Sequence, residues 1–404
     1  MTNIQIEPNY KFKTASVGCF LRLPLNQKNL ALANVLCVMQ SNASLLYPGV
    51  SLQAKALEEK YDSQLEIFPQ VFGNQIIIFY SLNFIEPREI LNPDYNYAEI
   101  IKMFLGIIKK PLFNPSLLYL AKSQLSSVRA QYLDIPSNYA LNRFFEYWYR
   151  NESQYKDNMF GDMEVIKNCT IEQIKSFFDN LKTYPAVCLG LVENPDMMTD
   201  LLQEQLDWPG FFRSFDTDEL TIPAHFAPFT KNEEGEHGQT QLLMGFGYGA
   251  SLPLDLRQFG GLILSQYLAG DESSKLFTSI REDLGAAYAI EVNNLLDDSL
   301  LLISAGIDKD KLLATKAKIN QSIRDVAKGN IDKILFKRAQ NALKRIYQSN
   351  EDQESLLLMQ LLANTLRGRS LTIEERIKKV VNFTPEKLTR FAQSLFLNES
   401  YCLQ

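Results

Sequence analysis

Apolar and polar positions along the chain predict one order of elements that is written twice. In the first half, runs of apolar residues predict strands and apolar residues at helical spacing predict helices. The predicted elements are, in chain order, strand 17–24, helix 30–39, helix 51–61, a strand near 65–68 and strand 76–82. The second half repeats them as strand 242–248, helix 256–268, helix 274–284, strand 286–292 and strand 300–307.

Helical patterns follow the strands in both halves. Residues 97–108 and 116–132 correspond to 309–327 and 333–347, and each half closes with a similar short motif. Thr170 and Thr384 each precede a helix that continues into phenylalanines, and a threonine hydroxyl at that place can accept a bond from the first helical turn. The repeat therefore predicts an α+β fold of two homologous halves, with strands early and helices late in each.

The stretch between the halves has no apolar periodicity. It contains three prolines and ends in a charged, glycine-containing run, which is typical of a linker. We therefore expect an N-terminal half over residues 1–208, a linker over 209–239 and a C-terminal half over 240–404.

Composition narrows the class of protein. The chain has 404 residues, of which 46% are hydrophobic and 22% charged, and a net charge of −6. These values are typical of a globular protein with more than one domain, and the negative charge argues against nucleic acid as a partner. Aromatic residues cluster between 144 and 155 without interleaved basic runs, so we interpret them as helix core.

The cysteines and the N-terminus favour a cytoplasmic location. Five cysteines, without a Cys-x-x-Cys pair, are scattered through apolar runs, which indicates buried, reduced thiols. The first residues carry no basic and apolar pattern of a secretory signal. The apolar run at 76–84 is too short to span a bilayer, so we expect no membrane partner.

Residues 270–288 are the most informative segment. We expect a polar turn starting at Gly270, a short helix capped by the hydroxyl of Ser273 or Ser274, a glycine stop at Gly285, and a strand. The apolar positions of that helix recur at helical spacing: Leu276, Phe277, Ile280 and Leu284. Arg281 and Tyr288 then lie on either side of one tight corner, where a guanidinium and a phenol can address the same peptide carbonyls.

This segment resembles the substrate-binding signature of the pitrilysin/insulinase metallopeptidases, the inverzincins. The resemblance implies that Arg281 and Tyr288 hold substrate and help to stabilise the tetrahedral intermediate, with Gly270, Ser273 and Ser274 in the substrate-binding turn. It also implies a mainly antiparallel sheet packed with helices in each half, and two halves joined into a clam around a peptide.

The zinc motif of that family is missing from this chain. Active members carry His-x-x-Glu-His on the first helix of the first half, where two imidazoles bind zinc and the glutamate polarises water. Here Asn34 and Val38 stand in place of the histidines and Cys37 in place of the glutamate. The third ligand is expected on the helix near 116–133, which has no acidic residue. We therefore expect no metal in this chain.

Other motifs predict no independent chemistry. The two histidines, His225 and His237, lie in the expected linker and share no predicted element, so we interpret them as linker residues. Cys37 has no histidine in its half to activate it as a nucleophile. The glycines at 245, 247 and 249 lack the spacing of a phosphate loop, and indicate either close backbone approach or an edge that accepts an extended ligand.

The resemblance and the missing zinc motif together suggest a division of labour. We expect a non-catalytic, substrate-binding subunit of a heterodimeric zinc peptidase, with Arg281 and Tyr288 acting beside the zinc of a homologous partner on a peptide substrate. The alternative is a pseudoenzyme that only binds peptides or serves as a scaffold, with both residues retained for packing.

Overall fold

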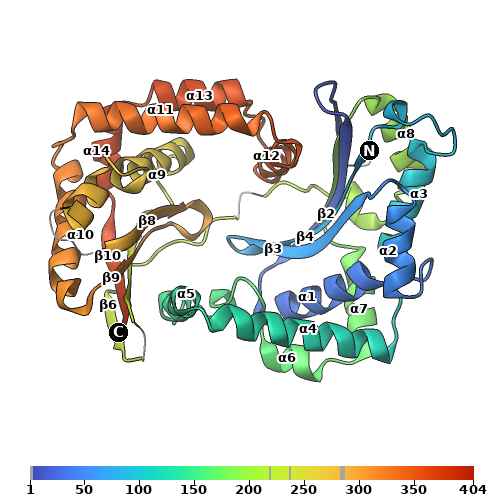
Figure 1. Cartoon of the computed structure of the whole chain (residues 1–404), viewed down its shortest axis with the longest axis horizontal. Coiled ribbons are helices and arrows are strands. Elements are labelled where there is room, and N and C mark those ends of the chain that lie inside the picture. Colours follow the sequence, from blue (N-terminus) through green and yellow to red (C-terminus); the bar gives the residue numbers. More distant parts are fainter. Residues whose placement is uncertain (1–2, 218–219, 236–237, 283–286) are drawn as a thin grey trace. The chain divides into compact units, whose positions relative to one another are not determined.

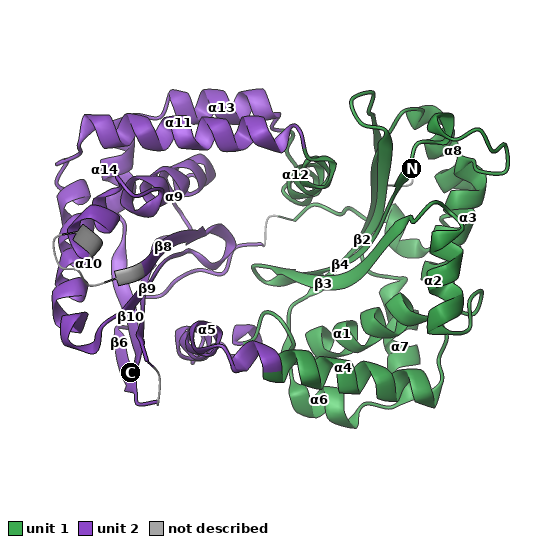
Figure 2. Ribbon diagram, viewed as in Figure 1, with its two compact units in different colours: residues 1–130, 157–219, 353–370 green, residues 131–156, 220–352, 371–404 purple. Residues whose placement is uncertain are grey.

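The computed structural model describes residues 3–217, 220–235, 238–282 and 287–404 (Figure 1). Within them the chain forms two compact units (Figure 2). Unit 1 comprises residues 1–130, 157–219 and 353–370, and unit 2 comprises residues 131–156, 220–352 and 371–404.

Unit 1 contains a five-stranded sheet and its helices. Its strands are β1 (Ile4–Pro8), β2 (Thr14–Pro24), β3 (Gln64–Phe72), β4 (Gln75–Ile85) and β5 (Ala186–Val192). Its α-helices are α1 (Gln27–Asn42), α2 (Val50–Glu58), α3 (Tyr97–Lys109), most of α4 (Pro115–Leu133), α6 (Met163–Asn168), α7 (Ile171–Leu181), α8 (Pro195–Gln205) and α12 (Glu354–Leu366).

Unit 2 contains the second sheet. Its strands are β6 (Phe229–Glu233), β7 (Thr240–Gly247), β8 (Ala287–Leu295), β9 (Leu300–Ile307) and β10 (Phe396–Leu403). Its α-helices are α5 (Pro136–Trp148), α9 (Leu254–Ala269), α10 (Leu312–Ala327), α11 (Lys333–Asn350), α13 (Ile373–Val381) and α14 (Pro385–Gln393).

The two sheets share one topology. The strand orders are β1-β5-β2-β4-β3 and β6-β10-β7-β9-β8, so each strand of the first sheet has a counterpart at the same place in the second. Strand β1 pairs in parallel with β5, and β6 pairs in parallel with β10. The other strand pairs of both sheets are antiparallel. The predicted fold class, an α+β duplication with a mainly antiparallel sheet in each half, is confirmed.

Both closing helices begin at the predicted threonines. The Thr170 hydroxyl accepts the backbone N–H of Gln173 at the start of α7, and the Thr384 hydroxyl accepts that of Lys387 at the start of α14. The long apolar strands are also where the pattern places them, and β9 has the predicted bounds.

The compact units do not follow the two sequence halves throughout. Helix α5 comes from the first half and packs on β7 and β10 of unit 2, whereas α12 comes from the second half and packs on β2 and β5 of unit 1. These strands are counterparts in the repeat. The stretch at 209–239, expected as a linker, also contains strand β6, which pairs with β10.

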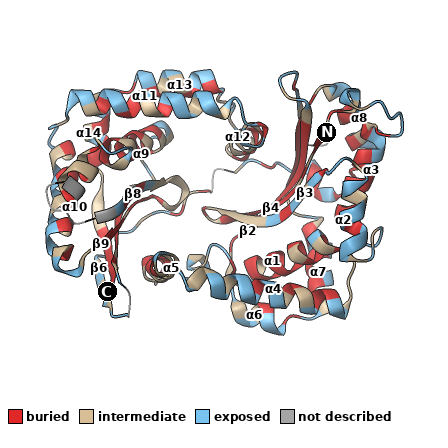
Figure 3. Cartoon of the chain, viewed as in Figure 1, coloured by how far each residue is buried: buried red, intermediate tan, exposed pale blue. Residues whose placement is uncertain are grey.

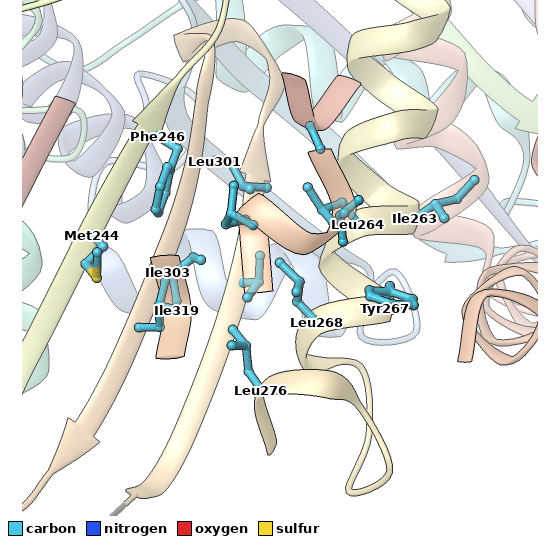
Figure 4. Packing of buried hydrophobic residues seen from close by; sticks show 14 of the residues in the cluster. Met244, Phe246, Ile263, Leu264, Tyr267, Leu268, Leu276, Leu301, Ile303 and Ile319 are labelled. Carbon is cyan, nitrogen blue, oxygen red and sulfur yellow. The ribbon is translucent and has the colours of Figure 1, made fainter. Parts of the chain in front are cut away.

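One face of the unit 2 sheet is covered by a large apolar core. Met244 and Phe246 of β7 and Leu301 and Ile303 of β9 point toward α9, and Leu276 reaches the same core (Figure 4). The outer faces of the covering helices are exposed (Figure 3). The opposite face of the sheet is covered by α5.

Helix α5 covers that face with aromatic side chains. Phe144 and Trp148 stack at 5.8 Å between ring centroids, and both belong to a cluster with Leu243, Leu302 and Tyr401. A Cβ atom at Gly245 would lie 2.6 Å from the Phe144 ring, so the strand needs glycine there. The aromatic run is therefore helix core, as predicted, and at Gly245 the glycine permits the predicted close approach.

Candidate functional site

Asn34 occupies the first position of the degenerate motif on α1. Its side-chain amide donates hydrogen bonds to the carbonyls of Leu30 at 3.0 Å, Met159 at 2.9 Å and Phe160 at 3.3 Å. The residue is buried. Asn34 therefore fastens α1 to the segment that follows residue 157, and its amide nitrogen serves as a donor and not as a metal ligand.

Cys37 and Val38 complete the degenerate motif. Cys37 is 1% exposed, and burial raises the pKa of its thiol well above the ordinary range, which disfavours the thiolate that binds a metal or attacks a substrate. Val38 has no lone pair to offer. Within the residues that the structure describes, no three His, Cys, Asp or Glu side chains gather closely enough to hold a metal ion. The residues present do not fit zinc.

The polar turn at 270–274 is organised by Asp271. Its carboxylate accepts the backbone N–H of Ser273 at 2.8 Å and the Ser273 hydroxyl at 2.7 Å, while the Ser274 hydroxyl donates to the Asp271 carbonyl at 2.6 Å. The Asp271 carboxylate and carbonyl thus accept the bonds of this turn and both serine hydroxyls donate, while the cap of the following helix by a serine hydroxyl stays a prediction. Ser274 is buried, and Gly270 ends α9.

The helix after this turn is a π-helical turn over Phe277–Glu282 and not the α-helix that the spacing predicted. Leu276 and Ile280 are fully buried and anchor the turn in the unit 2 core. π-Helical turns are rare in proteins, and those that occur are often found at functional sites. Gly285, the predicted stop, lies outside the described residues.

Arg281 and Tyr288 lie in two successive backbone elements of unit 2. Arg281 lies in the π-helical turn and Tyr288 in β8. In the pairing of β8 with β9, Ala287 opposes Ile307 and Ala289 opposes Gly306, so Tyr288 is the extra residue of a β-bulge. A bulge changes the direction of a side chain and is frequent beside active sites. Their role in substrate binding stays a prediction.

A groove of about 780 Å³ lies in unit 2. Ala289 and Glu291, which follow Tyr288 in β8, are among the residues that line it. Its walls are the first turn of α5 and neighbouring residues of β7, β8 and β9. Gln241, Ser304 and Glu291 lie in adjacent strands, and the register places Glu291 opposite Ser304. Glu291 is exposed and is the only formally charged residue among the described residues that line the groove. The volume is in the range of sites that hold small ligands or short peptide segments.

Part of this arrangement was not visible to sequence analysis. The π-helical turn, the bulge at Tyr288 and the groove all follow from backbone geometry and strand register. One sequence signal for the groove is the change in polarity along the α5 side of β9, where the leucines at 300 and 302 are followed by Ser304. His225 is exposed before β6, and His237 lies outside the described residues.

No helix among the described residues has both the length and the apolar composition needed to cross a bilayer.

Sequence comparisons point to one peptidase family. Residues 168–343 match the family model described as the peptidase M16 inactive domain. The chain is 25% identical over 182 residues to an uncharacterized zinc protease, YmxG, of Bacillus subtilis, covering 44% of this chain and 43% of the relative. It is 26% identical over 161 residues to an uncharacterized zinc protease of Rickettsia bellii, covering 39% of each. The matches span less than half of the length of these relatives.

Solved structures share the fold over nearly the whole chain. A conserved protein from Enterococcus faecalis has a TM-score of 0.88 at 19% identity, covering 99% of this chain and 96% of that one. A protease from Helicobacter pylori has a TM-score of 0.81 at 15% identity, with the same coverage. A peptidase M16 inactive domain from Pseudomonas fluorescens has a TM-score of 0.80 at 14% identity, covering 99% and 94%.

These matches agree with the degenerate positions on α1 and with the signature segment of unit 2. The predicted resemblance is confirmed: part of the chain matches the peptidase M16 inactive domain, the chain is similar to zinc proteases, and its fold is that of M16-like structures.

Proposed function

We propose that the chain is the substrate-binding subunit of a heterodimeric zinc peptidase, and that it supplies Arg281 and Tyr288 to the zinc site of a homologous partner. One contrast carries the proposal. In the first half the motif positions offer no metal site, since the side-chain amide of Asn34 donates hydrogen bonds to three backbone carbonyls. The second half keeps the signature, with Arg281 in a π-helical turn and Tyr288 at a bulge.

The two side chains suit a supporting role in peptide hydrolysis. A guanidinium and a phenol can donate hydrogen bonds to a peptide carbonyl, and these bonds strengthen as the oxygen gains negative charge. Neither group generates a nucleophile at neutral pH. The chemistry that attacks the carbonyl therefore belongs to the partner, and this chain binds and orients the peptide.

The groove of unit 2 supports the assignment of peptide as the ligand. It combines side-chain amides and two serine hydroxyls, which can bond to a peptide backbone, with a carboxylate at Glu291 that favours a cationic group. Strand β8, which contributes Glu291 and Ala289 to the groove, also carries Tyr288. A peptide held in the groove would thus contact the strand that presents the signature tyrosine.

The test compares hydrolysis of one peptide library by the partner alone, by the partner with wild-type chain, and by the partner with Arg281→Ala or Tyr288→Phe. The partner is a homologous subunit with an intact His-x-x-Glu-His motif, identified by co-purification from the native host. We expect the wild-type chain to raise turnover, and each variant to lower that turnover about a hundredfold or more. The isolated chain should cleave nothing and retain no stoichiometric zinc.

Matched controls separate substrate contact from general damage. Arg338→Ala and Tyr119→Phe change the same residue types at exposed positions of α11 and α4, and both should retain wild-type stimulation. Full activity of the partner without this chain, or wild-type behaviour of both signature variants, would contradict the subunit assignment. The chain would then be a peptide-binding or scaffold protein.

A further inference from the structure

Two buried cysteines of unit 1 face each other across neighbouring strands. Cys19 of β2 lies directly opposite Cys188 of β5, and their Sγ atoms are 2.9 Å apart. The backbone N–H of Cys188 bonds to the carbonyl of Asn3, on the side away from β2. Cys19 and Cys188 therefore form a non-hydrogen-bonded antiparallel pair, the arrangement in which opposite side chains come closest.

A small cavity lies beside one member of this pair. A space of about 10 Å³, enough for about one water molecule, is lined by Cys19 but not by Cys188. Its other walls include Trp208 and the ion pair between Lys109 and Asp207, whose atoms are 2.7 Å apart. Both cysteines are at most 1% exposed and burial raises the pKa of the Cys188 thiol, so we assign the reaction with an oxidant to Cys19, beside the cavity.

The other three cysteines lack this arrangement. Cys169 donates its thiol to the carbonyl of Ile166 at 3.3 Å, and Cys402 lies in unit 2. Cys37 is on α1, near Tyr80, which is paired with Cys19 across β2 and β4. Cys37 is thus the competing partner that an experiment must exclude.

We infer that Cys19 and Cys188 are a redox site, which closes to a cross-strand disulfide when a small peroxide reaches Cys19. The Cys19 sulfur takes one oxygen from hydrogen peroxide as the O–O bond breaks, and the other oxygen leaves as water. The Cys188 sulfur then attacks the resulting sulfenic acid, the S–O bond breaks, and the hydroxyl leaves as a second water with the proton of the Cys188 thiol. Two thiols are oxidised and one peroxide is reduced to two waters.

The disulfide would constrain the centre of the unit 1 sheet. It would join residues 169 positions apart in the sequence, on strands that both have neighbours on each side. A cross-link over so long a separation removes many conformations from the unfolded chain, so the oxidised form should be the more heat-stable one. Oxidation of the site by peroxide would thus make unit 1 more rigid.

The experiment treats the full-length chain with hydrogen peroxide, then unfolds it in alkylating reagent and maps the five cysteines by mass spectrometry without reduction. Wild-type chain should lose two free thiols as a Cys19–Cys188 cross-link, regain them with dithiothreitol, and show a thermal midpoint raised by roughly 5–10 °C while oxidised. Cys19→Ser and Cys188→Ser should form no cross-link and show no such rise. Cys37→Ser should behave as wild type.

Three outcomes would overturn the inference, and all three are measured on wild-type chain, so they remain decisive even if a variant fails to fold. These are five free thiols after treatment, a cross-link between Cys19 and Cys37, and a Cys19–Cys188 cross-link that leaves the thermal midpoint unchanged.

Discussion

Helices α5 and α12 hold equivalent places in the repeat, yet different chemistry attaches them to their sheets. Helix α5 packs phenylalanine and tryptophan on the unit 2 sheet, and its Arg143 binds Glu233 of β6 at 2.7 Å. Helix α12 buries leucines in unit 1, and its Glu354 accepts hydrogen bonds from Thr14 at 2.5 Å and Asn83 at 3.2 Å. The duplication preserved the topology of the exchanged helices, while the side chains that attach them diverged.

The two attachments also place a carboxyl group in opposite electrostatic environments. The guanidinium of Arg143 holds the pKa of Glu233 down to about 2, and the hydroxyls of Tyr147 and Tyr401 act in the same direction. Burial raises the pKa of Glu354 above its usual range, and its hydrogen bonds to Thr14 and Asn83 offset this only in part. One helix is thus attached through a carboxylate whose pKa is lowered by a guanidinium, and the other through a carboxyl group whose pKa is raised by burial.

The largest expected effect concerns the aromatic contact of α5. Phe144→Ala should lower the free energy of unfolding by about 3–5 kcal/mol, because Phe144 is fully buried and its loss leaves a cavity. Leu362→Ala on α12, at a fully buried position, should cost less, about 2–4 kcal/mol. Thermal and denaturant unfolding measure both, and Tyr119→Ala, at a site 76% exposed, is the control.

The same contact can be tested from the strand side. Gly245→Ala should destabilise wild-type chain, because the new Cβ atom would meet the Phe144 ring at 2.6 Å. In the Phe144→Ala background the same substitution should be better tolerated. Equal costs in the two backgrounds would show that Gly245 is needed for another contact, such as the Trp148 ring, which would lie 2.8 Å from the new Cβ atom.

A smaller effect should distinguish the two helices by pH. Glu233 has a depressed pKa in the folded chain. Its contribution to the free energy of unfolding is therefore present above the unfolded pKa near 4.5 and is lost as pH falls toward about 2. Arg143→Met should therefore cost about 1–3 kcal/mol at neutral pH and progressively less between pH 4.5 and 2. Glu354 has a raised pKa in the folded chain. Its contribution to the free energy of unfolding is therefore largest below pH 4.5 and is lost as pH rises.

Glu354→Gln should consequently gain stability relative to wild type as pH increases above 4.5, by on the order of 1 kcal/mol. Hydrogen exchange followed separately on α5 and α12 across this pH range checks both changes. Parallel pH responses of the two helices would remove the electrostatic distinction drawn between them.

The smallest effect concerns the paired N-caps. Thr170→Ala and Thr384→Ala should each cost about 1 kcal/mol, since each hydroxyl accepts a bond from the first turn of its helix. Thr170 should cost slightly more, because Gln173 also reaches back to its backbone N–H at 3.0 Å, and α14 has no such reciprocal bond. Unfolding measured on the two variants side by side decides the order.

The sequence predicted local structure well and tertiary contacts poorly, for a physical reason. Apolar spacing marks which face of α5 or α12 is buried, but it does not say which sheet will cover that face, so the exchange between units was not foreseen. Val38 could be assigned as a non-ligand from residue chemistry alone, whereas the hydrogen bonds of Asn34 and the burial of Cys37 required the structure. Helical spacing of Leu276 and Ile280 could not separate a π-helical turn from an α-helix, because two buried positions fit both.

The exchange of α5 and α12 also constrains how the protein is made. As the chain leaves the ribosome, the aromatic face of α5 emerges long before β7 and β10, the strands that cover it. The unit 1 sheet in turn waits for α12, which begins at residue 354. Neither unit can finish folding while only the first half exists, so nascent chains must carry an uncovered apolar surface through most of synthesis, which invites aggregation or binding by chaperones.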